Sequence, residues 1–439
     1  MAGLGKQGFL YSNDQAGQYP DSYYHATANT MMRFPRQQGE ETTDVCVIGA
    51  GFTGLSAALH LAEAGYRVIL LDAHRVGWGA SGRNGGQLAA DQRCDQETLE
   101  KQYGKAEAHA LWELGLASNQ LCKTLIQRHH ISCDLTPGII HADHKPRYLK
   151  HSQAYVDKLQ TEYGYEHIRY LAQPEIRQLI GSERFYGGSL DTNAAHLHPL
   201  NFALGLAQAA QQAGVTIYEH SPVLSYSDEQ QVCITLAEGN IKAAHVILAC
   251  NGYLDQLNKK VAAKVMPINN YMIATEPLSE AMARQLLRDN HAVADSRFVV
   301  NYFRLSADRR LLFGGGENYS FKFPADIKRF VQRHMLDIYP QLKHTSIDYS
   351  WGGTLAITMS RMPYFAKLSE QVLSVSGYSG HGVAMATLAG KIMAEMIDGK
   401  LAHFDTMAKL KSYPFPGGSG FRWPLLVLAM SYYSLQDRL

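Results

Sequence analysis

Three glycines in the stretch VCVIGAGFTGLSAALHLAEAG have the spacing of a phosphate-binding turn. Gly49, Gly51 and Gly54 follow an apolar run and open a segment with helical apolar spacing. Such glycines allow a tight turn, a close approach of backbone to a pyrophosphate, and close packing of helix on strand. Asp72 ends the next apolar run, where a carboxylate can accept hydrogen bonds from ribose hydroxyls. The pattern predicts a dinucleotide site, and by itself it fits NAD as well as FAD.

Two further glycine-rich turns favour FAD. Residues 76–87, VGWGASGRNGGQ, directly follow the second strand, at the sheet edge where ligands of doubly wound folds bind. Residues 377–390, GYSGHGVAMATLAG, form a glycine turn that opens another helix. The N-terminus of that helix would stabilise the negative charge that a flavin gains on reduction. The three turns together predict one site for the whole of FAD.

The remaining reactive residue types predict no second centre. His196 and His198 lack a carboxylate or cysteine at ligand spacing, so we expect no metal. The six cysteines are scattered without a CxxC pair, which is typical of reduced, buried thiols. We also find no nucleophile elbow.

The elements that must position the glycine turns begin with a βαβ unit, formed by DVCVIGAG, TGLSAALHLAEAG and RVILLDA. Helical periodicity dominates the next hundred residues, and the strand-like segments GIIHA and YGGSL interrupt it. From residue 266 to 351, alternating segments such as NNYMIATEPL and LLFGGGE predict an antiparallel sheet that could wall a substrate.

We therefore predict an α/β protein, with a Rossmann-like FAD-binding domain interleaved with an α+β substrate domain built on an antiparallel sheet. The FAD-binding domain is expected to come from three separate stretches of the chain. The expected segments are an N-terminal arm (1–43), a first FAD-binding stretch (44–100), a helical and mixed insertion (101–195), a second FAD-binding stretch (196–265), the substrate domain (266–350), and a third FAD-binding stretch with the C-terminal tail (351–439).

The composition limits the partners. Of 439 residues, 46% are hydrophobic, and 41 Lys and Arg balance 40 Asp and Glu, so no overall field attracts a nucleic acid. The first twenty residues lack a basic segment followed by an apolar core, and no apolar run reaches the roughly 18 residues of a membrane span. We expect a cytoplasmic protein without a membrane span, and its oligomeric state stays open.

The motifs resemble those of the D-amino-acid-oxidase-like FAD amine oxidoreductases. The matching stretches include GWGASGRNGGQ, HLHPLNFALG, YFRLSADRRLLFGGG, SRMPYF, GYSGHGV, and the tail YPFPGG followed by SYYSLQDRL. Within that family the chain is most similar to members that act on γ-glutamylated diamines. The resemblance implies a role in polyamine catabolism, in which a terminal amine becomes an aldehyde and ammonia, with hydrogen peroxide formed if oxygen is the acceptor.

Two alternatives stay open. One is an amine dehydrogenase that acts on another polyamine or a secondary amine and passes electrons to a quinone or a flavoprotein. The other is an assembly or RNA-modifying component whose flavin is structural, and the missing basic stripes argue against it. Some relatives place a lysine beside the flavin in the strand that here reads LLFGGG, where we find only Leu311 and Leu312.

The resemblance also assigns cofactor roles, from the adenosine ribose at Asp72 to the flavin pyrimidine at Gly380. The segment WGGTLAIT lacks the cysteine that tethers flavin in some relatives, so we expect FAD to be bound non-covalently. The expected FAD-binding residues are Gly49, Gly51, Phe52, Thr53, Gly54, Asp72, Ala73, Gly79, Ala80, Ser81, Gly82, Arg83, Asn84, Gly85, Gly86, Gln87, Val223, Ala249, Asn251, Gly252, Gly353, Gly380, His381 and Gly382.

The reacting amine must be neutral, with its C–H bond aimed at the flavin between apolar or aromatic walls. The candidate catalytic residues are Tyr302, Trp351, Tyr378, His381 and Gln87, although each aromatic could simply be a packing residue. Relatives that oxidise α-amino acids hold the substrate carboxylate with arginines near the positions of Trp351 and Ser379. Both arginines are absent here, so we expect an amine whose carboxylate is distal and bound by Arg304 or another basic residue, with Trp351 also contacting the substrate.

Overall fold

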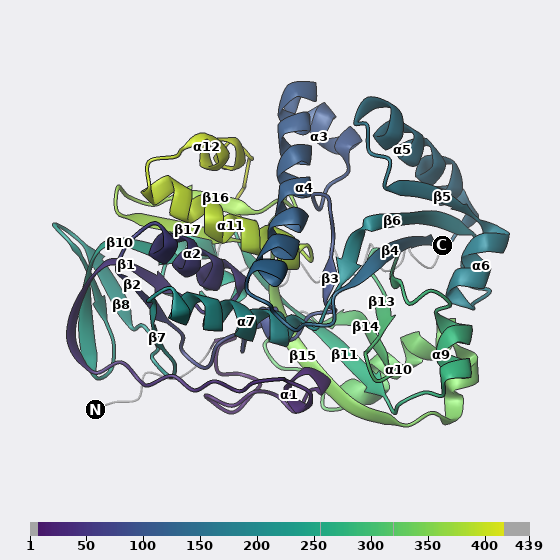
Figure 1. Cartoon of the computed structure of the whole chain (residues 1–439), viewed down its shortest axis with the longest axis horizontal. Coiled ribbons are helices and arrows are strands. Elements are labelled where there is room, and N and C mark those ends of the chain that lie inside the picture. Colours follow the sequence, from purple (N-terminus) through teal and green to yellow (C-terminus); the bar gives the residue numbers. More distant parts are fainter. Residues whose placement is uncertain (1–7, 255, 319, 417–439) are drawn as a thin grey trace.

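The computed structural model describes residues 8–254, 256–318 and 320–416. Two sheets lie side by side, one in each half of the molecule, and a long helix, α4 (Lys105–Arg128), stands between them (Figure 1). The C-terminal tail, which contributed to the family resemblance, lies outside the described residues from 417 onward.

The first sheet contains eight strands among the described residues, and its centre is parallel. The path across it runs through β16 (Tyr364–Lys367), β17 (Val372–Ser376), β10 (Gly239–Leu248), β1 (Gly39–Ile48), β2 (Val68–Leu71) and β7 (Thr216–Tyr218). Off this path, β8 (Ser225–Asp228) pairs with β9 (Val232–Thr235), which pairs antiparallel with β10. The βαβ unit predicted from the sequence is present, and β1 begins earlier than expected, within the segment assigned to the arm.

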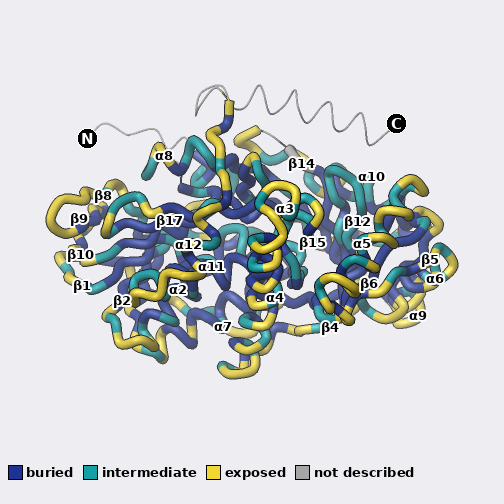
Figure 2. Tube along the Cα trace, turned by 90° about the horizontal axis from the view of Figure 1, so that it is seen from above, coloured by how far each residue is buried: buried dark blue, intermediate teal, exposed yellow. Residues whose placement is uncertain are grey.

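The central strand β1 shows why this half forms a parallel sheet. Its last residues, from Cys46 to Ile48, are buried, and alternate side chains belong to two different apolar clusters, one on each face of the sheet. Helix α2 (Phe52–Glu63) packs against α11 (Gly382–Ile397) and α7 (Pro199–Gln212) on one of these faces. Figure 2 shows that this half is buried along its strands and exposed mainly at its edge loops.

The second sheet has nine described strands and is mostly antiparallel. Its path runs through β15 (Ile347–Ile357), β11 (Met266–Thr275), β14 (Leu311–Asn318), β13 (Tyr302–Leu305), β12 (Ala292–Asp295), β4 (Thr136–Asp143), β6 (Gly187–His196) and β3 (Gln87–Leu88), with β5 (Ile168–Ala172) on β6. Strands β4 and β6 come from the segment predicted as an insertion, and β4 pairs in parallel with β12. One sheet thus joins this segment to the predicted substrate domain, while the division into six segments stays a proposal.

The remaining helices lie mainly outside the two sheets. They are α1 (Tyr23–Ala26), α3 (Gln96–Tyr103), α4 (Lys105–Arg128), α5 (Leu149–Glu162), α6 (Gln173–Ile180), α8 (Lys259–Ala262), α9 (Glu280–Leu286), α10 (Ile327–Ile338) and α12 (Ala402–Ala408). The helical periodicity of residues 97–130 is divided between α3 and α4, because Gly104 between them has a φ of +85°. None of the described helices combines the length and the apolar character that a bilayer span requires.

The described part of the N-terminal arm, residues 8–38, runs along one side of the molecule and reaches both halves (Figure 1). In the first half, Asp14 pairs with the buried guanidinium of Arg83 at 2.6 Å. In the second half, the hydroxyl of Tyr23 donates to the carboxylate of Asp308 at 2.8 Å. The arm therefore ties the FAD-side loops to the second sheet.

Candidate active site

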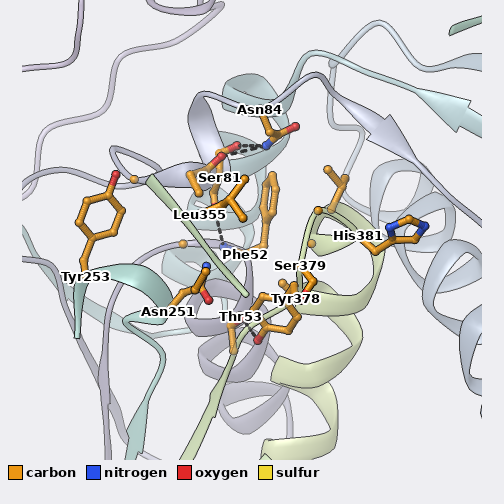
Figure 3. A pocket seen from close by; sticks show the side chains of 18 of the residues that line it. Phe52, Thr53, Ser81, Asn84, Asn251, Tyr253, Leu355, Tyr378, Ser379 and His381 are labelled. Carbon is orange, nitrogen blue, oxygen red and sulfur yellow. Dashed lines mark hydrogen bonds between the residues drawn. The ribbon is translucent and has the colours of Figure 1, made fainter. Parts of the chain in front are cut away.

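A cavity of about 1110 Å³ joins the glycine turns of the first sheet to the inner side of the second. Its volume exceeds the roughly 300–1,000 Å³ of an ordinary small-molecule site, so it has room for a dinucleotide and a substrate together. Figure 3 shows a close view, with Phe52, Ser81 and Asn84 near one another and Tyr378 beside Thr53.

The turn between β1 and α2 has the geometry of a phosphate cradle. Gly49 has a φ of +111°, and a Cβ added to Gly54 would lie 1.8 Å from the carbonyl oxygen of Gly49. Gly51, the N-cap of α2, provides no side-chain cap, so the positive end of the helix faces the cavity. The serine hydroxyl of Ser81 accepts the N–H of Phe52 at 3.0 Å and holds the next loop against this turn. The residues present fit a pyrophosphate here.

Asp72 lies at the end of β2 and lines the same cavity. Its carboxylate accepts the N–H groups of Ala50 and His74, both at 2.8 Å. Burial raises the pKa of Asp72 to about 6, although the two N–H bonds oppose the shift. The side chain is thereby held in one orientation, in which its remaining acceptor capacity suits ribose hydroxyls.

The loop after β2 folds back on itself. The amide of Asn84 donates to the carbonyls of Ala80 and Ser81, both at 3.0 Å, and its oxygen accepts the N–H of Gly86 at 2.7 Å. These bonds fix the backbone of Gly85, which lines the cavity, without using a bulky side chain. The loop can therefore lie close to a flat ring.

The turn before α11 forms the facing wall. The hydroxyls of Tyr378 and Thr53 are hydrogen-bonded at 2.6 Å, which joins this turn to α2, and burial raises the pKa of Tyr378. Nε2 of His381 lies 3.5 Å from the carboxylate of Asp91. Burial raises the pKa of Asp91, but the hydrogen bond and charge of His381, together with His141, outweigh it and leave that pKa low.

The second sheet supplies the remaining wall. The ring of Tyr302 packs against Gly85, and its hydroxyl makes a short hydrogen bond to the amide oxygen of Asn270. The amide of Gln87 donates to the carbonyl of Val293 at 2.8 Å. Both Tyr302 and Gln87 line the cavity.

Most of the expected site residues meet at this cavity. Those that line it are Gly49, Gly51, Phe52, Thr53, Asp72, Ala73, Gly79, Ala80, Ser81, Asn84, Gly85, Gln87, Val223, Ala249, Asn251, Tyr302, Tyr378, Gly380, His381 and Gly382. The expected residues outside its lining are Gly54, Gly82, Arg83, Gly86, Gly252, Gly353, Trp351 and Arg304.

Two of the residues outside the lining were assigned direct substrate contacts, and the structure corrects this placement. Trp351 is 2% exposed, and its indole N–H donates to the carbonyl of Arg83 at 2.9 Å, so it supports the loop from behind. Arg304 is 3% exposed, and its guanidinium donates to the carbonyls of Gly85 and Leu197, both at 2.8 Å. Arg83 is likewise buried and donates to the carbonyl of Trp78 at 2.7 Å.

Sequence reasoning missed several cavity residues that follow or precede the glycine loops. The loop after β3 contributes Asp91 and Arg93, and the N-terminal arm contributes Leu10 and Tyr11. The charged motif DQRCDQ, directly after the glycine loop, was a usable signal for the first pair. No signal marks the second pair, because the path of the arm depends on distant contacts.

Comparison with known proteins agrees with the geometry. Residues 44–396 match the family described as DAO, FAD dependent oxidoreductase, and the chain belongs to that family. It is a flavoprotein oxidoreductase, and its cofactor is FAD.

Individual relatives match over most of the chain. The chain is 40% identical to the gamma-glutamylputrescine oxidoreductase of Escherichia coli (strain K12), over 96% of this chain and 99% of that one. It is 38% identical to a probable oxidoreductase of Rhizobium meliloti (strain 1021), over 95% and 97%. The crystal structure of glycine oxidase from Geobacillus kaustophilus superposes with a TM-score of 0.71 at 20% identity, covering 83% of this chain and 98% of that one.

Proposed function

We propose that this protein oxidises the terminal primary amine of a γ-glutamylated diamine, such as γ-glutamylputrescine, to an aldehyde in polyamine catabolism. Ammonia is the second product, and oxygen is the acceptor that becomes hydrogen peroxide. The proposal is supported by the likeness, along nearly the whole chain, to a relative named for γ-glutamylputrescine.

The carbon beside the nitrogen loses a hydride and the nitrogen loses a proton, which gives an imine. Water then adds to the imine, and ammonia leaves the aldehyde. Bound FAD supplies the acceptor for the hydride. Oxygen takes up the two electrons with two protons as hydrogen peroxide. The protein must bind the amine, remove its extra proton and exclude water.

The carboxylate of Asp91 is the observation that carries the choice of an amine. It lines the cavity and has a lowered pKa, so it stays ionised at neutral pH and attracts an ammonium group. A negative charge at this place would repel the carboxylate of an α-amino acid from the same position. An amine without an adjacent carboxylate is therefore the better match.

We propose that His381, in its neutral form, receives the proton. Its Nε2 lies 3.5 Å from the carboxylate of Asp91, which would stabilise the imidazolium once it forms. Tyr302 and Tyr378 supply aromatic surface on two sides, and their hydroxyls are held by Asn270 and Thr53. These walls would exclude water around the reacting carbon.

The test mixes the FAD-loaded enzyme with γ-glutamylputrescine, and in parallel with putrescine, cadaverine and their γ-glutamyl forms. Without oxygen, we expect the γ-glutamyl compounds to bleach the visible absorbance of the oxidised flavin. With oxygen, we expect one peroxide and one ammonia for each amine consumed. If no amine bleaches the flavin, the proposal is overturned; bleaching with electron transfer only to a quinone or dye identifies the dehydrogenase instead.

The contribution of Asp91 is tested with Asp91→Asn, which removes the charge and keeps the size. We expect kcat/KM for the cationic amine to fall about 10- to 100-fold, with FAD still bound. Asp157→Asn is the matched control, because Asp157 is exposed on α5. Equal activity of the two variants would remove Asp91 from the mechanism.

A further inference from the structure

We propose that Arg93 binds the distal carboxylate of the substrate and thereby selects γ-glutamylated amines over free diamines. This inference rests on the proposed function, because it names the region of the same cavity that recognises the glutamyl group. Arg93 takes the substrate-binding role that the sequence suggested for Arg304, whose N–H donors already bind other protein groups.

Arg304 cannot turn to a ligand without opening the glycine loop. Its guanidinium donates to the carbonyls of Gly85, Leu197 and Leu305 at 2.8 to 3.1 Å, and to the hydroxyl of Tyr24 at 3.2 Å. All four bonds are buried or partly buried, so breaking them would leave polar groups without partners. The residue holds the loop and is not available for a substrate.

Arg93 has the opposite surroundings. It lines the cavity, half-buried, and only its Nε makes a hydrogen bond among the described residues, to the carbonyl of Ser379 at 3.1 Å. In the described stretches of the chain no carboxylate lies within ion-pairing distance of its guanidinium. The remaining N–H donors of its planar fork can therefore bind a carboxylate in the bidentate manner that arginine favours.

The loop that carries Arg93 is anchored on both sides. The amide of Gln92 donates to the carbonyl of Leu111 at 2.8 Å, inside the protein. Asp95 caps α3 by accepting the N–H of Thr98 at 2.7 Å. The backbone on both sides of Arg93 is therefore held, so a ligand has to order only the side chain.

The two charges of this loop are kept apart. Asp91 faces His381, whereas Arg93 bonds to Ser379, and the two side chains form no ion pair with each other. The charges of Asp91 and Arg93 therefore do not neutralise each other. A γ-glutamylated diamine carries a terminal ammonium group and, at its other end, a carboxylate beside the glutamyl ammonium, while a free diamine carries only cations. Arg93 would repel the second ammonium of a free diamine.

A second arginine, Arg361, also lines the cavity, and it serves as the comparison. Its guanidinium lies over the ring of Phe298, 5.7 Å from the ring centre, on a tight turn where its φ is +62°. The guanidinium of Arg361 is therefore stacked on an aromatic ring. We therefore expect Arg361→Gln to affect substrates with and without a carboxylate alike.

The experiment compares γ-glutamylputrescine with 4-aminobutyrylputrescine, in which hydrogen replaces the carboxylate. For Arg93→Gln we expect KM for the first compound to rise about 10- to 100-fold with kcat changed no more than about twofold. KM for the second compound, which carries only ammonium groups, should stay the same or fall. Arg93→Lys keeps the positive charge but lacks the planar guanidinium. We expect its KM for γ-glutamylputrescine to lie between the values for the unchanged protein and for Arg93→Gln. Bound FAD per chain and the melting temperature check that each variant is folded.

Binding of γ-glutamylbutylamide, which keeps the glutamyl end but has no terminal amine, gives a readout independent of turnover. Calorimetry on the FAD-loaded enzyme is expected to show the same loss of affinity for Arg93→Gln. The assignment would be overturned if Arg93→Gln raised KM equally for both substrates. It would also be overturned if Arg361→Gln, and not Arg93→Gln, raised KM only for the substrate with the carboxylate. If no amine is oxidised but γ-glutamylbutylamide binds through Arg93, the proposed reaction fails and this inference stands.

Discussion

The ion pair between Asp14 and Arg83 joins the N-terminal arm to the loop that lies over the cavity, and its removal should weaken the whole fold. The side chain of Arg83 is 2% exposed and that of Asp14 is 17% exposed, and their charged groups lie 2.6 Å apart. Asp14→Asn keeps the size and one acceptor but removes the counter-charge. A buried cation then remains without a carboxylate among the described residues.

The expected loss of stability depends on the interactions that Arg83 retains in the variant. Removing one partner of a buried ion pair costs about 3–5 kcal/mol when nothing else compensates. Here the guanidinium still donates to the carbonyls of Trp78 and Gly352, at 2.7 and 3.1 Å, and stacks 4.3 Å from the Trp78 ring centre. We therefore expect Asp14→Asn to lower the free energy of unfolding by about 2–3 kcal/mol.

Urea denaturation of the FAD-loaded enzyme measures this loss. The matched control is Glu238→Gln, because Glu238 also binds the arm, through Arg36, but at an exposed site where the two side chains are 39% and 54% exposed. An exposed pair of this kind contributes about 0–1 kcal/mol. Equal losses in the two variants would show that the buried pair does not hold the arm, and the reasoning would be refuted.

Three further predictions concern the cofactor turn, its support and the response to pH. Gly54→Ala should lower the free energy of unfolding by about 3 kcal/mol or more and abolish FAD retention, because the added Cβ would lie 1.8 Å from the carbonyl oxygen of Gly49. The FAD absorbance per chain measures the retention. Tyr378→Phe should lower the free energy of unfolding, measured by urea denaturation, by about 1–2 kcal/mol, because the hydroxyl of Thr53 loses its hydrogen-bond partner at 2.6 Å. Burial lowers the pKa of His198 to about 3, so the folded protein binds fewer protons than the unfolded chain between pH 6.5 and 3. Stability should therefore fall as the pH falls through that window, by up to about 1.4 kcal/mol per unit, and His198→Asn, which keeps the helix cap, should lessen the slope.

The phosphate cradle was predictable because its signals are local. Gly49, Gly51 and Gly54 lie within one turn and between two short apolar runs, so spacing alone specifies strand, turn and helix. The position of Tyr302 at the cavity was predicted as well. Its residue type and its place in the antiparallel segment were visible in the sequence.

The positions of the arginines at and near the cavity depend on contacts between distant parts of the chain, which the spacing of residues in the sequence does not encode. Arg93 reaches the cavity because its loop meets Ser379, 286 residues further along the chain. Arg304 looked like a substrate ligand by residue type, but the carbonyls of Gly85 and Leu197 surround it. A buried arginine that holds backbone and one that meets a ligand look alike in sequence. Only the three-dimensional partners distinguish them.

The parallel pairing of β1 with β10 has a consequence for synthesis. Gly39 pairs with Gly239, and β10 pairs in turn with β17, which begins at Val372. A growing chain can therefore pair β1 with β2 early, but the other edge of β1 stays exposed until β10 emerges from the ribosome. Residues 378–382 line the same cavity, so the cavity is complete only after most of the chain has been made. We expect the nascent chain to need protection from aggregation until then.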